Sequence, residues 1–350
     1  MLEINDLETR YTTDAGDVHA VSGVSFTVDQ KETLGLVGES GCGKTTLAKS
    51  IFDLLPRNGD VVSGSVKLNG TEITELSEAE LRKQIRWQEI SMIPQTAMNG
   101  LDPVQTVGDQ IIQVIRTHED VSKKEARQRA RDLFEELGLD PERISDYPHQ
   151  FSGGMAQRAM IALSLALSPS IVLADEPTTA LDVMIQDRIL NLINNIQDDY
   201  EMGMIMITHD MSVVSETCDT IAVMYAGQIV ESADSRSVIK NPRHPYTMGL
   251  RNAFPDISED SQELVSVPGE PPELIDPEPG CKFAPRCPFA VDECRETDPE
   301  PREFEDGHIV ECHRADEAEE LRKEAEKSET WLEMADDDDA SAAAVVETDD

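Results

Sequence analysis

Basic residues are scarce in this sequence. The 350 residues include 30 Lys and Arg against 70 Asp and Glu, which gives a formal net charge of -40 at pH 7. A surface this acidic repels nucleic acid and anionic lipid, so neither is expected as a direct partner. The acidic residues are spread over the whole chain, which favours a protein from a halophilic, haloarchaeal-like organism, where salt screens self-repulsion. One acidic tail on an ordinary protein would explain only part of the excess.

Long apolar runs and a signal peptide are also missing. The longest apolar stretch, residues 159–174, is broken by Ser168, Pro169 and Ser170, and either part is too short to span a bilayer. The first residues, Met-Leu-Glu-Ile-Asn-Asp, lack the apolar core of a signal peptide. We therefore expect a cytosolic chain that reaches a membrane only through partners. Its six cysteines are then not expected to form disulfides.

A glycine-rich segment at residues 38–46 is the strongest signal in the chain. It follows a short apolar run, Thr33–Val37, and precedes a segment with helical spacing, Leu47–Phe52. Its glycines let backbone N–H groups point inward, and the helix N-terminus adds positive potential. Lys44 can reach the β- and γ-phosphates, and the Thr45 hydroxyl can ligate Mg²⁺. We predict a nucleotide-binding loop made of Gly38, Glu39, Ser40, Gly41, Cys42, Gly43, Lys44, Thr45 and Thr46.

Three other apolar runs end in polar side chains. Ile171–Ala174 is followed by Asp175 and Glu176, the pair that a Mg²⁺-nucleotide site needs. Asp175 would hold the metal, usually through water, and Glu176 would polarise the attacking water. The runs at residues 90–94 and 204–208 end at Gln95 and His209. Taken alone, a glutamine at a strand end is more often an ordinary polar group of a loop.

The order of segments predicts the fold class. Apolar strands alternate with helical segments, which indicates an α/β fold with a mainly parallel sheet covered on both faces. Residues 1–32 instead form two alternating runs around Asp14–Asp17, which predicts an antiparallel hairpin. Residues 105–165 have helical spacing, with Ser152 and Gly153 at the start of one helix.

Together these motifs resemble those of the ATP-binding subunit of ABC transporters, over roughly residues 1–250. The segments that match are a Walker A motif at 38–45, a Q-loop at Gln95, a signature at 151–155, a Walker B motif at 171–176, a D-loop at Asp182 and a switch histidine at His209. The resemblance implies a P-loop NTPase with an antiparallel β subdomain and a helical subdomain at about 96–165. It also implies ATP as the nucleotide, catalytic roles for Lys44, Gln95, Glu176 and His209, Mg²⁺ ligation by Thr45, Gln95 and Asp175, and adenine stacking on Tyr11.

Two positions depart from the commonest pattern of this family. The signature reads Phe-Ser-Gly-Gly-Met rather than Leu-Ser-Gly-Gly-Gln, and Cys42 stands where serine is commoner. Ser152, Gly153 and Gly154, which supply phosphate donors, are intact. The resemblance implies that two ATPase subunits, identical or homologous, pair head to tail, with Ser152 of one facing the nucleotide held by Lys44 of the other. It further implies two transmembrane permease subunits, an extracellular solute-binding protein that acts indirectly, and a place at the cytoplasmic face of the membrane.

Residues 241–314 resemble the C-terminal extension of oligopeptide, dipeptide and nickel importer ATPases. Three segments carry this resemblance: His244–Leu250, Pro268–Pro272 and Gly280–Pro288. It implies an ATPase that drives uptake of dipeptides or oligopeptides, with nickel or another small solute left open. A soluble ABC ATPase acting on DNA or ribosomes would be expected to have basic patches, coiled-coil insertions or tandem cassettes. A small-molecule P-loop kinase would leave the signature and His209 without a role.

The extension contains four cysteines in a proline-rich segment too small to build its own core, which often signals a metal centre. They are Cys281, Cys287, Cys294 and Cys312. Four thiolates suit Zn²⁺ or an iron-sulfur cluster. The spacing lacks the paired CxxC of a zinc ribbon, and some relatives of this branch carry a [4Fe-4S] cluster here, so we expect that cluster. Zn²⁺ and unliganded buried thiols are the alternatives. His308 and His313 are possible substitute ligands, although surface positions are expected.

Residues 315–350 are acidic and rich in helix-forming residues. We expect a solvated helix followed by a disordered tail, with a partner contact through Trp331 and Leu332 as the less favoured alternative. The predicted division of the chain is an ATPase domain at 1–240, the extension at 241–314 and this acidic end at 315–350.

Overall fold

The structure, a computed structural model, describes residues 1–96, 100–178, 183–253 and 267–331. Within these residues lies an eight-stranded sheet in the order β11-β12-β10-β9-β3-β8-β7-β6. Five strands run parallel: β9 (Thr220–Tyr225), β3 (Thr33–Val37), β8 (Gly203–Thr208), β7 (Ile171–Asp175) and β6 (Ile90–Ile93). Three continue the sheet antiparallel: β10 (Gln228–Asp234), β12 (Ile309–Val310) and β11 (Arg302–Glu303). The predicted α/β fold with a mainly parallel sheet is confirmed.

Both faces of the parallel strands are buried, which explains why their sequences are continuous apolar runs. In β8, Met204 and Met206 join the core that contains α8 (Met211–Thr217). Ile205 and Ile207 point the other way and join a second core with α1 (Lys44–Ile51). The alternation of side chains along each strand therefore divides the interior into two layers.

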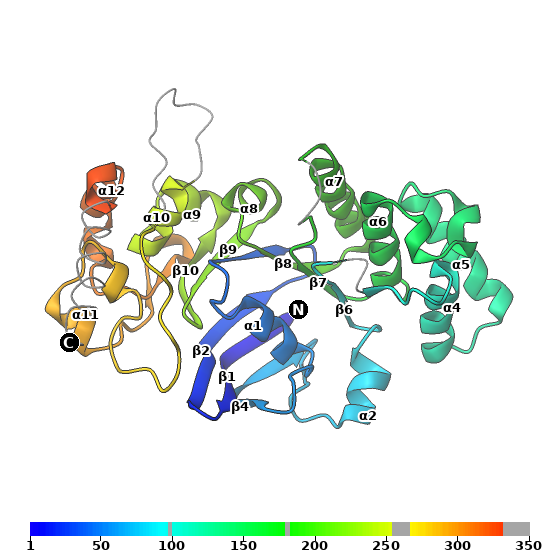
Figure 1. Cartoon of the computed structure of the whole chain (residues 1–350), viewed down its shortest axis with the longest axis horizontal. Coiled ribbons are helices and arrows are strands. Elements are labelled where there is room, and N and C mark those ends of the chain that lie inside the picture. Colours follow the sequence, from blue (N-terminus) through cyan, green and yellow to red (C-terminus); the bar gives the residue numbers. More distant parts are fainter. Residues whose placement is uncertain (97–99, 179–182, 254–266, 332–350) are drawn as a thin grey trace, which may run out of the picture.

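A second, four-stranded antiparallel sheet belongs to the layer that contains α1. Its order is β2-β1-β4-β5, with β1 (Leu2–Thr13), β2 (Gly16–Val28), β4 (Gly59–Leu68) and β5 (Thr71–Glu72). Thr13 pairs with Gly16, so the predicted hairpin is confirmed. Figure 1 shows α1 lying beside β1 and β2. The loop before α1 is therefore held between the two sheets.

The helical part of the chain lies beyond β6, at the end of the molecule opposite the C-terminal extension (Figure 1). It contains α4 (Val107–His118), α5 (Lys123–Glu136), α6 (Gly153–Ser164) and 3-10 turns at Pro141–Ser145 and Pro148–Gln150. Ser152 is the N-cap of α6, as predicted. Other helices described before the extension include α2 (Glu78–Glu80), a π-helix at Leu81–Ile85, and α7 (Val183–Tyr200). No helix in the described part of the chain is both long and apolar enough to cross a membrane.

The C-terminal extension packs on the edge of the main sheet. It adds β12 to β10 and contains α10 (Pro245–Asn252), α11 (Asp292–Glu296) and 3-10 turns at Ala284–Arg286 and Glu305–Gly307. α9 (Ser235–Lys240) precedes it, and a 3-10 turn at Ala315–Glu317 and α12 (Ala318–Ala325) follow it. The expectation of a wholly solvated last helix is wrong, because Leu321 and Ala325 are buried. Trp331 is also buried, edge-on to Phe289, so its ring is not available as a partner anchor. The division at residues 240 and 314 stays a prediction.

Candidate functional site

The phosphate-binding loop lies between β3 and α1. Gly41 and Gly43 have φ angles of 84° and 108°, the left-handed region that favours glycine. A Cβ atom on Gly43 would stand 2.3 Å from the carbonyl oxygen of Ala20, and one on Gly38 would stand 2.1 Å from that of Met224. Backbone conformation thus favours glycine at two positions, Gly41 and Gly43, and close backbone neighbours require it at two, Gly38 and Gly43.

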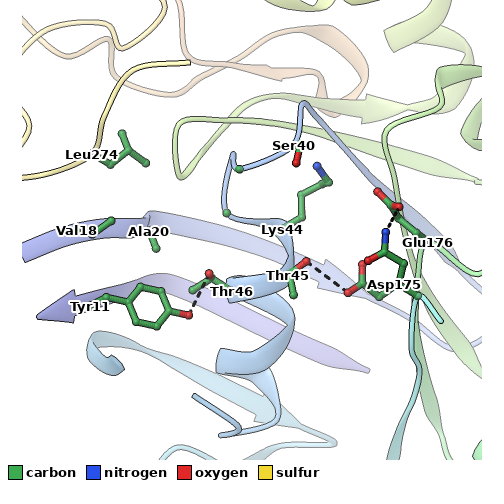
Figure 2. Close-up of a pocket in the computed structure, with 13 residues that line it drawn as sticks. Tyr11, Val18, Ala20, Ser40, Lys44, Thr45, Thr46, Asp175, Glu176 and Leu274 are labelled. Carbon is green, nitrogen blue, oxygen red and sulfur yellow. Dashed lines mark hydrogen bonds between the residues drawn. The ribbon is translucent and has the colours of Figure 1, made fainter. Parts of the chain in front are cut away.

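Lys44 begins α1 and is only 7% exposed. Its Nζ donates hydrogen bonds to the carbonyl oxygens of Gly38, at 2.6 Å, and Glu39, at 2.8 Å. Figure 2 shows the side chain pointing toward Ser40, inside the curve of the loop. The Cys42 side chain is buried, and burial raises its pKa. Only the backbone of Cys42 can therefore meet a phosphate, which explains how cysteine replaces serine there.

The carboxylates at the end of β7 face this loop. Thr45 Oγ1 donates to Asp175 Oδ2 at 3.4 Å (Figure 2). Burial raises the pKa of Asp175, and the neighbouring Glu176 raises it further. A bound divalent cation would favour the ionised carboxylate instead. Thr45 and Asp175 are hydroxyl and carboxylate oxygens, the donor types that Mg²⁺ prefers, and they lie on one side of the loop.

Glu176 is held from two directions by two other predicted catalytic residues, Gln95 and His209. Gln95 Nε2 donates to Glu176 Oε2 at 2.6 Å, and His209 Nδ1 lies 3.0 Å from Glu176 Oε1. Glu176 itself has a φ of 45°, an uncommon backbone conformation for a side chain of this type. The ends of β6, β7 and β8 thus bring three residues distant in sequence to one point.

A cavity of about 360 Å³ adjoins these groups, within the range of small-molecule sites. Figure 2 shows Lys44, Asp175 and Glu176 toward one end and Tyr11 toward the other. The Tyr11 hydroxyl donates to Thr46 Oγ1 at 3.2 Å. The residues that line the cavity are Tyr11, Val18, Ala20, Ser40, Gly41, Gly43, Lys44, Thr45, Thr46, Gln95, Asp175, Glu176 and Leu274. A second cavity, of about 480 Å³, shares Ser40, Gln95 and Glu176 and also has His209 in its wall.

Some predicted site residues lie elsewhere. Ser152 is exposed at the start of α6, and Ser152, Gly153 and Gly154 are not in the wall of the nucleotide cavity. Asp182 lies outside the described residues. Sequence reasoning missed Leu274, which reaches the cavity wall from the extension, because a single apolar residue in a proline-rich segment carries no signal. It also missed Arg286, whose guanidinium binds the Glu39 carboxylate with N–O distances of 2.7 and 3.0 Å.

The four extension cysteines line one small cavity of about 10 Å³, together with Phe283, Phe289 and His313. All are free thiols, and burial raises the pKa of Cys281, Cys287 and Cys312. A raised pKa favours the protonated thiol, whereas a metal takes the thiolate; the residue type nevertheless fits a thiolate metal centre. The positions do not, since no group of three or more His, Cys, Asp or Glu in the described chain is arranged to hold a metal ion. The surface position expected for His308 is wrong: it is 5% exposed and hydrogen-bonded to buried Glu231 at 2.6 Å.

Comparison with known proteins matches both parts of this architecture. A family model described as ABC transporter matches residues 21–179, and one described as Oligopeptide/dipeptide transporter, C-terminal region, matches residues 230–294. The probable peptide ABC transporter ATP-binding protein y4tR of Sinorhizobium fredii is 46% identical over 91% of this chain and 96% of its own length. The chain belongs to the ABC transporter family.

Other members of the ABC transporter family align over a similar length. The oligopeptide transport ATP-binding protein OppD of Salmonella typhimurium is 43% identical over 89% of this chain and 93% of its own length. The dipeptide transport ATP-binding protein DppD of Bacillus subtilis is 43% identical over 89% of this chain and 94% of its own. A solved dimeric ATP-binding cassette, bound to ADP and phosphate after hydrolysis, has a TM-score of 0.61 and 26% identity. It covers 67% of this ABC chain and 99% of that one, so the predicted P-loop NTPase fold is confirmed.

Proposed function

We propose that this chain is the ATP-hydrolysing subunit of an ABC importer for dipeptides or oligopeptides. The observation that carries the proposal is that one chain combines the phosphate loop and paired acids with the C-terminal region of oligopeptide and dipeptide transporters. Relatives that align over most of their length are named for peptide, oligopeptide or dipeptide transport. Uptake of nickel or another small solute is the second candidate, because selectivity would reside in other subunits.

In the proposed reaction, the phosphate loop and Lys44 bind the β- and γ-phosphates of ATP. Glu176 polarises the attacking water, while Gln95 and His209 orient its carboxylate and lie beside the γ-phosphate. Thr45 and Asp175, with Gln95, would hold Mg²⁺, which supplies charge neutralisation during phosphoryl transfer. The hydrogen bonds to both Glu176 oxygens support this assignment, because they fix the carboxylate before substrate binds.

The signature is proposed to act on a neighbouring subunit. Ser152, Gly153 and Gly154 begin α6, outside the wall of the cavity that holds Lys44. A head-to-tail pair of ATPase subunits would place them over the nucleotide of the partner, with Asp182 near the shared interface. Support comes from two solved structures of one ATP-binding cassette, both of which are dimeric. The second subunit is either identical or a distinct homologue.

The membrane partners are proposed to be two permease subunits, which would place this chain at the cytoplasmic face, with a solute-binding protein outside. A groove of about 220 Å³ supports a docking site near Gln95. It contains Pro94, Trp87 and the exposed residue Leu54. A permease helix seated there would link its movement to Gln95 and hence to Glu176.

The four cysteines are proposed to hold a [4Fe-4S] cluster, with Zn²⁺ as the alternative. Four thiols around one cavity support a metal centre. The cavity of about 10 Å³ holds roughly one water-sized atom, so a cluster would require the thiols to move apart.

The excess of acidic residues supports a high-salt, halophilic setting.

Reconstitution tests the import function. The full chain would be combined with its permeases in vesicles, and ATP hydrolysis measured with the solute-binding protein loaded with a dipeptide, an oligopeptide or Ni²⁺. Stimulation by a peptide-loaded protein supports the proposal. Stimulation by Ni²⁺ alone would replace peptide by nickel, and unchanged hydrolysis in every arm would contradict coupling to import.

A further inference from the structure

We propose that Arg286 is a positioning residue of the nucleotide site, supplied to the phosphate-binding loop by the C-terminal extension. The inference rests on nucleotide binding at that loop. Arg286 lies between Cys281 and Cys287 and far along the chain from Glu39, yet its guanidinium binds the Glu39 carboxylate. The Arg286 side chain is 5% exposed and that of Glu39 is 25% exposed. The contact is therefore largely buried, and it joins the extension to the phosphate-binding loop.

The geometry of the pair fixes the orientation of Glu39. Nη1 donates to Oε2 at 2.7 Å and Nη2 to Oε1 at 3.0 Å, the two-pronged arrangement that gives arginine its directional specificity. Arg286 is itself held by the extension, since Nε donates to the Pro268 carbonyl at 2.8 Å and Nη2 to the Val267 carbonyl at 3.2 Å. The extension therefore decides where the Glu39 carboxylate lies.

Glu39 also contacts Lys44, the residue that is proposed to bind the phosphates. Its backbone carbonyl accepts from Lys44 Nζ at 2.8 Å. Its backbone N–H donates to the hydroxyl of Tyr246, a fully buried residue of α10. The Tyr246 ring packs against Phe283, at 5.4 Å between ring centroids. One residue of the loop is thus held through its side chain, its N–H and its carbonyl, and two of these three contacts come from beyond residue 240.

The charges of Arg286 and Glu39 predict the direction in which each substitution changes ATP binding. Glu39 follows Gly38 in the loop that receives the triphosphate, and an unpaired carboxylate there would repel it. Arg286 neutralises that carboxylate in a half-buried setting, where the interaction is less screened than at the surface. Loss of Arg286 alone leaves an unpaired negative charge in the phosphate-binding loop. Loss of both charges removes the repulsion, so the double variant should bind ATP better than the arginine variant alone.

The experiment measures affinity of the full chain for Mg²⁺ and a non-hydrolysable ATP analogue, together with the melting temperature. The variants are Arg286→Met, Arg286→Lys, Glu39→Gln and the double variant Arg286→Met with Glu39→Gln. Arg314→Met is the matched control. Arg314 lines the cysteine cavity, and its bonds, to the Phe289 carbonyl and to Glu317, do not reach the phosphate-binding loop.

We expect Arg286→Met to weaken binding by about tenfold, the size of a moderate coupling between two sites. The double variant should recover most of this loss, Arg286→Lys should lie between Arg286→Met and the wild type, and Arg314→Met should bind normally. If Arg286→Met does not fold, the ATP-analogue affinities of Arg286→Lys and Glu39→Gln are compared instead, and Arg286→Lys is expected to bind more weakly. Normal binding by Arg286→Met, or a double variant no better than it, would overturn the inference. Failure of the wild type to bind would instead overturn the nucleotide site itself.

Discussion

At the scale of the residue, Glu176 shows how the fold prepares one side chain for chemistry. Its left-handed backbone follows directly from β7, and its two carboxylate oxygens meet Gln95 and His209. A strained backbone conformation persists only where the surrounding structure maintains it. The strain therefore supports a role that depends on position as well as on charge.

Replacing Glu176 by Gln should retain ATP binding and stop turnover. The amide keeps the size and hydrogen-bonding capacity of the side chain but cannot polarise water as a base, so hydrolysis should fall by about 10² to 10⁴-fold. Steady-state phosphate release and analogue binding measure the two effects separately. Glu201→Gln is the control, because that exposed carboxylate pairs with Lys31 and does not line the nucleotide cavity. Equal turnover in the two variants would exclude Glu176 as the base.

At the scale of the element, the phosphate-binding loop contains glycines for two different reasons: a positive φ and the close approach of other backbone atoms. Gly41 and Gly43 both have positive φ, but a Cβ atom meets nothing within 4 Å at Gly41 and a backbone oxygen at 2.3 Å at Gly43. Gly41→Ala should cost about 1–2 kcal/mol from backbone strain alone. Gly43→Ala should cost about 3 kcal/mol, because the loop must also move away from Ala20.

Gly70→Ala is the control for these two substitutions. Gly70 has a φ of 79° and open space around it, but it lies in the turn between β4 and β5, away from the nucleotide cavity. It should destabilise the chain as much as Gly41→Ala and leave ATP affinity unchanged. Chemical unfolding and analogue binding check both quantities. A Gly43→Ala variant as stable as Gly41→Ala would show that the close contact carries no cost.

The cysteine-containing extension gives a prediction of its own. If the four thiols hold a [4Fe-4S] cluster, anaerobic protein should absorb in the visible range and contain iron, and chelation should lower the melting temperature because the metal ties the extension together. Replacing Cys218 by Ser is the control, because that buried thiol belongs to the core near α8 and not to the cavity. Zinc without iron would reject the cluster, and neither metal would favour buried free thiols.

The sequence predicted those parts of the site that are local, and missed those that depend on contacts across the chain. The loop from Gly38 to Thr46 and the pair Asp175 and Glu176 each lie beside their own strand, so pattern and chemistry coincide. Arg286 reaches Glu39 only after the extension has folded over the main sheet, and nothing around Arg286 in sequence indicates that destination. Trp331 was misjudged for the same reason, because an aromatic residue in an acidic segment gives no sign of the core that buries it.

At the scale of the whole molecule, charge and association are linked. Even if each of the 30 basic residues paired with one acid, at least 40 of the 70 acidic residues would have no basic partner. These charges repel within the folded chain, and two chains brought head to tail would repel each other as well. The same excess should therefore oppose both folding and dimer formation at low salt.

The melting temperature should consequently rise with KCl, most steeply below about 1 M. Over that range the Debye length falls from about 10 Å at 0.1 M to about 3 Å, so screening removes most of the repulsion. Sucrose is the control, since it favours compact states by exclusion from the protein surface without screening charge. Light scattering by the Glu176→Gln chain with the ATP analogue would measure dimer formation over the same series of KCl concentrations. A melting temperature that does not change with KCl, or rises no more than in sucrose, would show that the acidic surface does not limit stability.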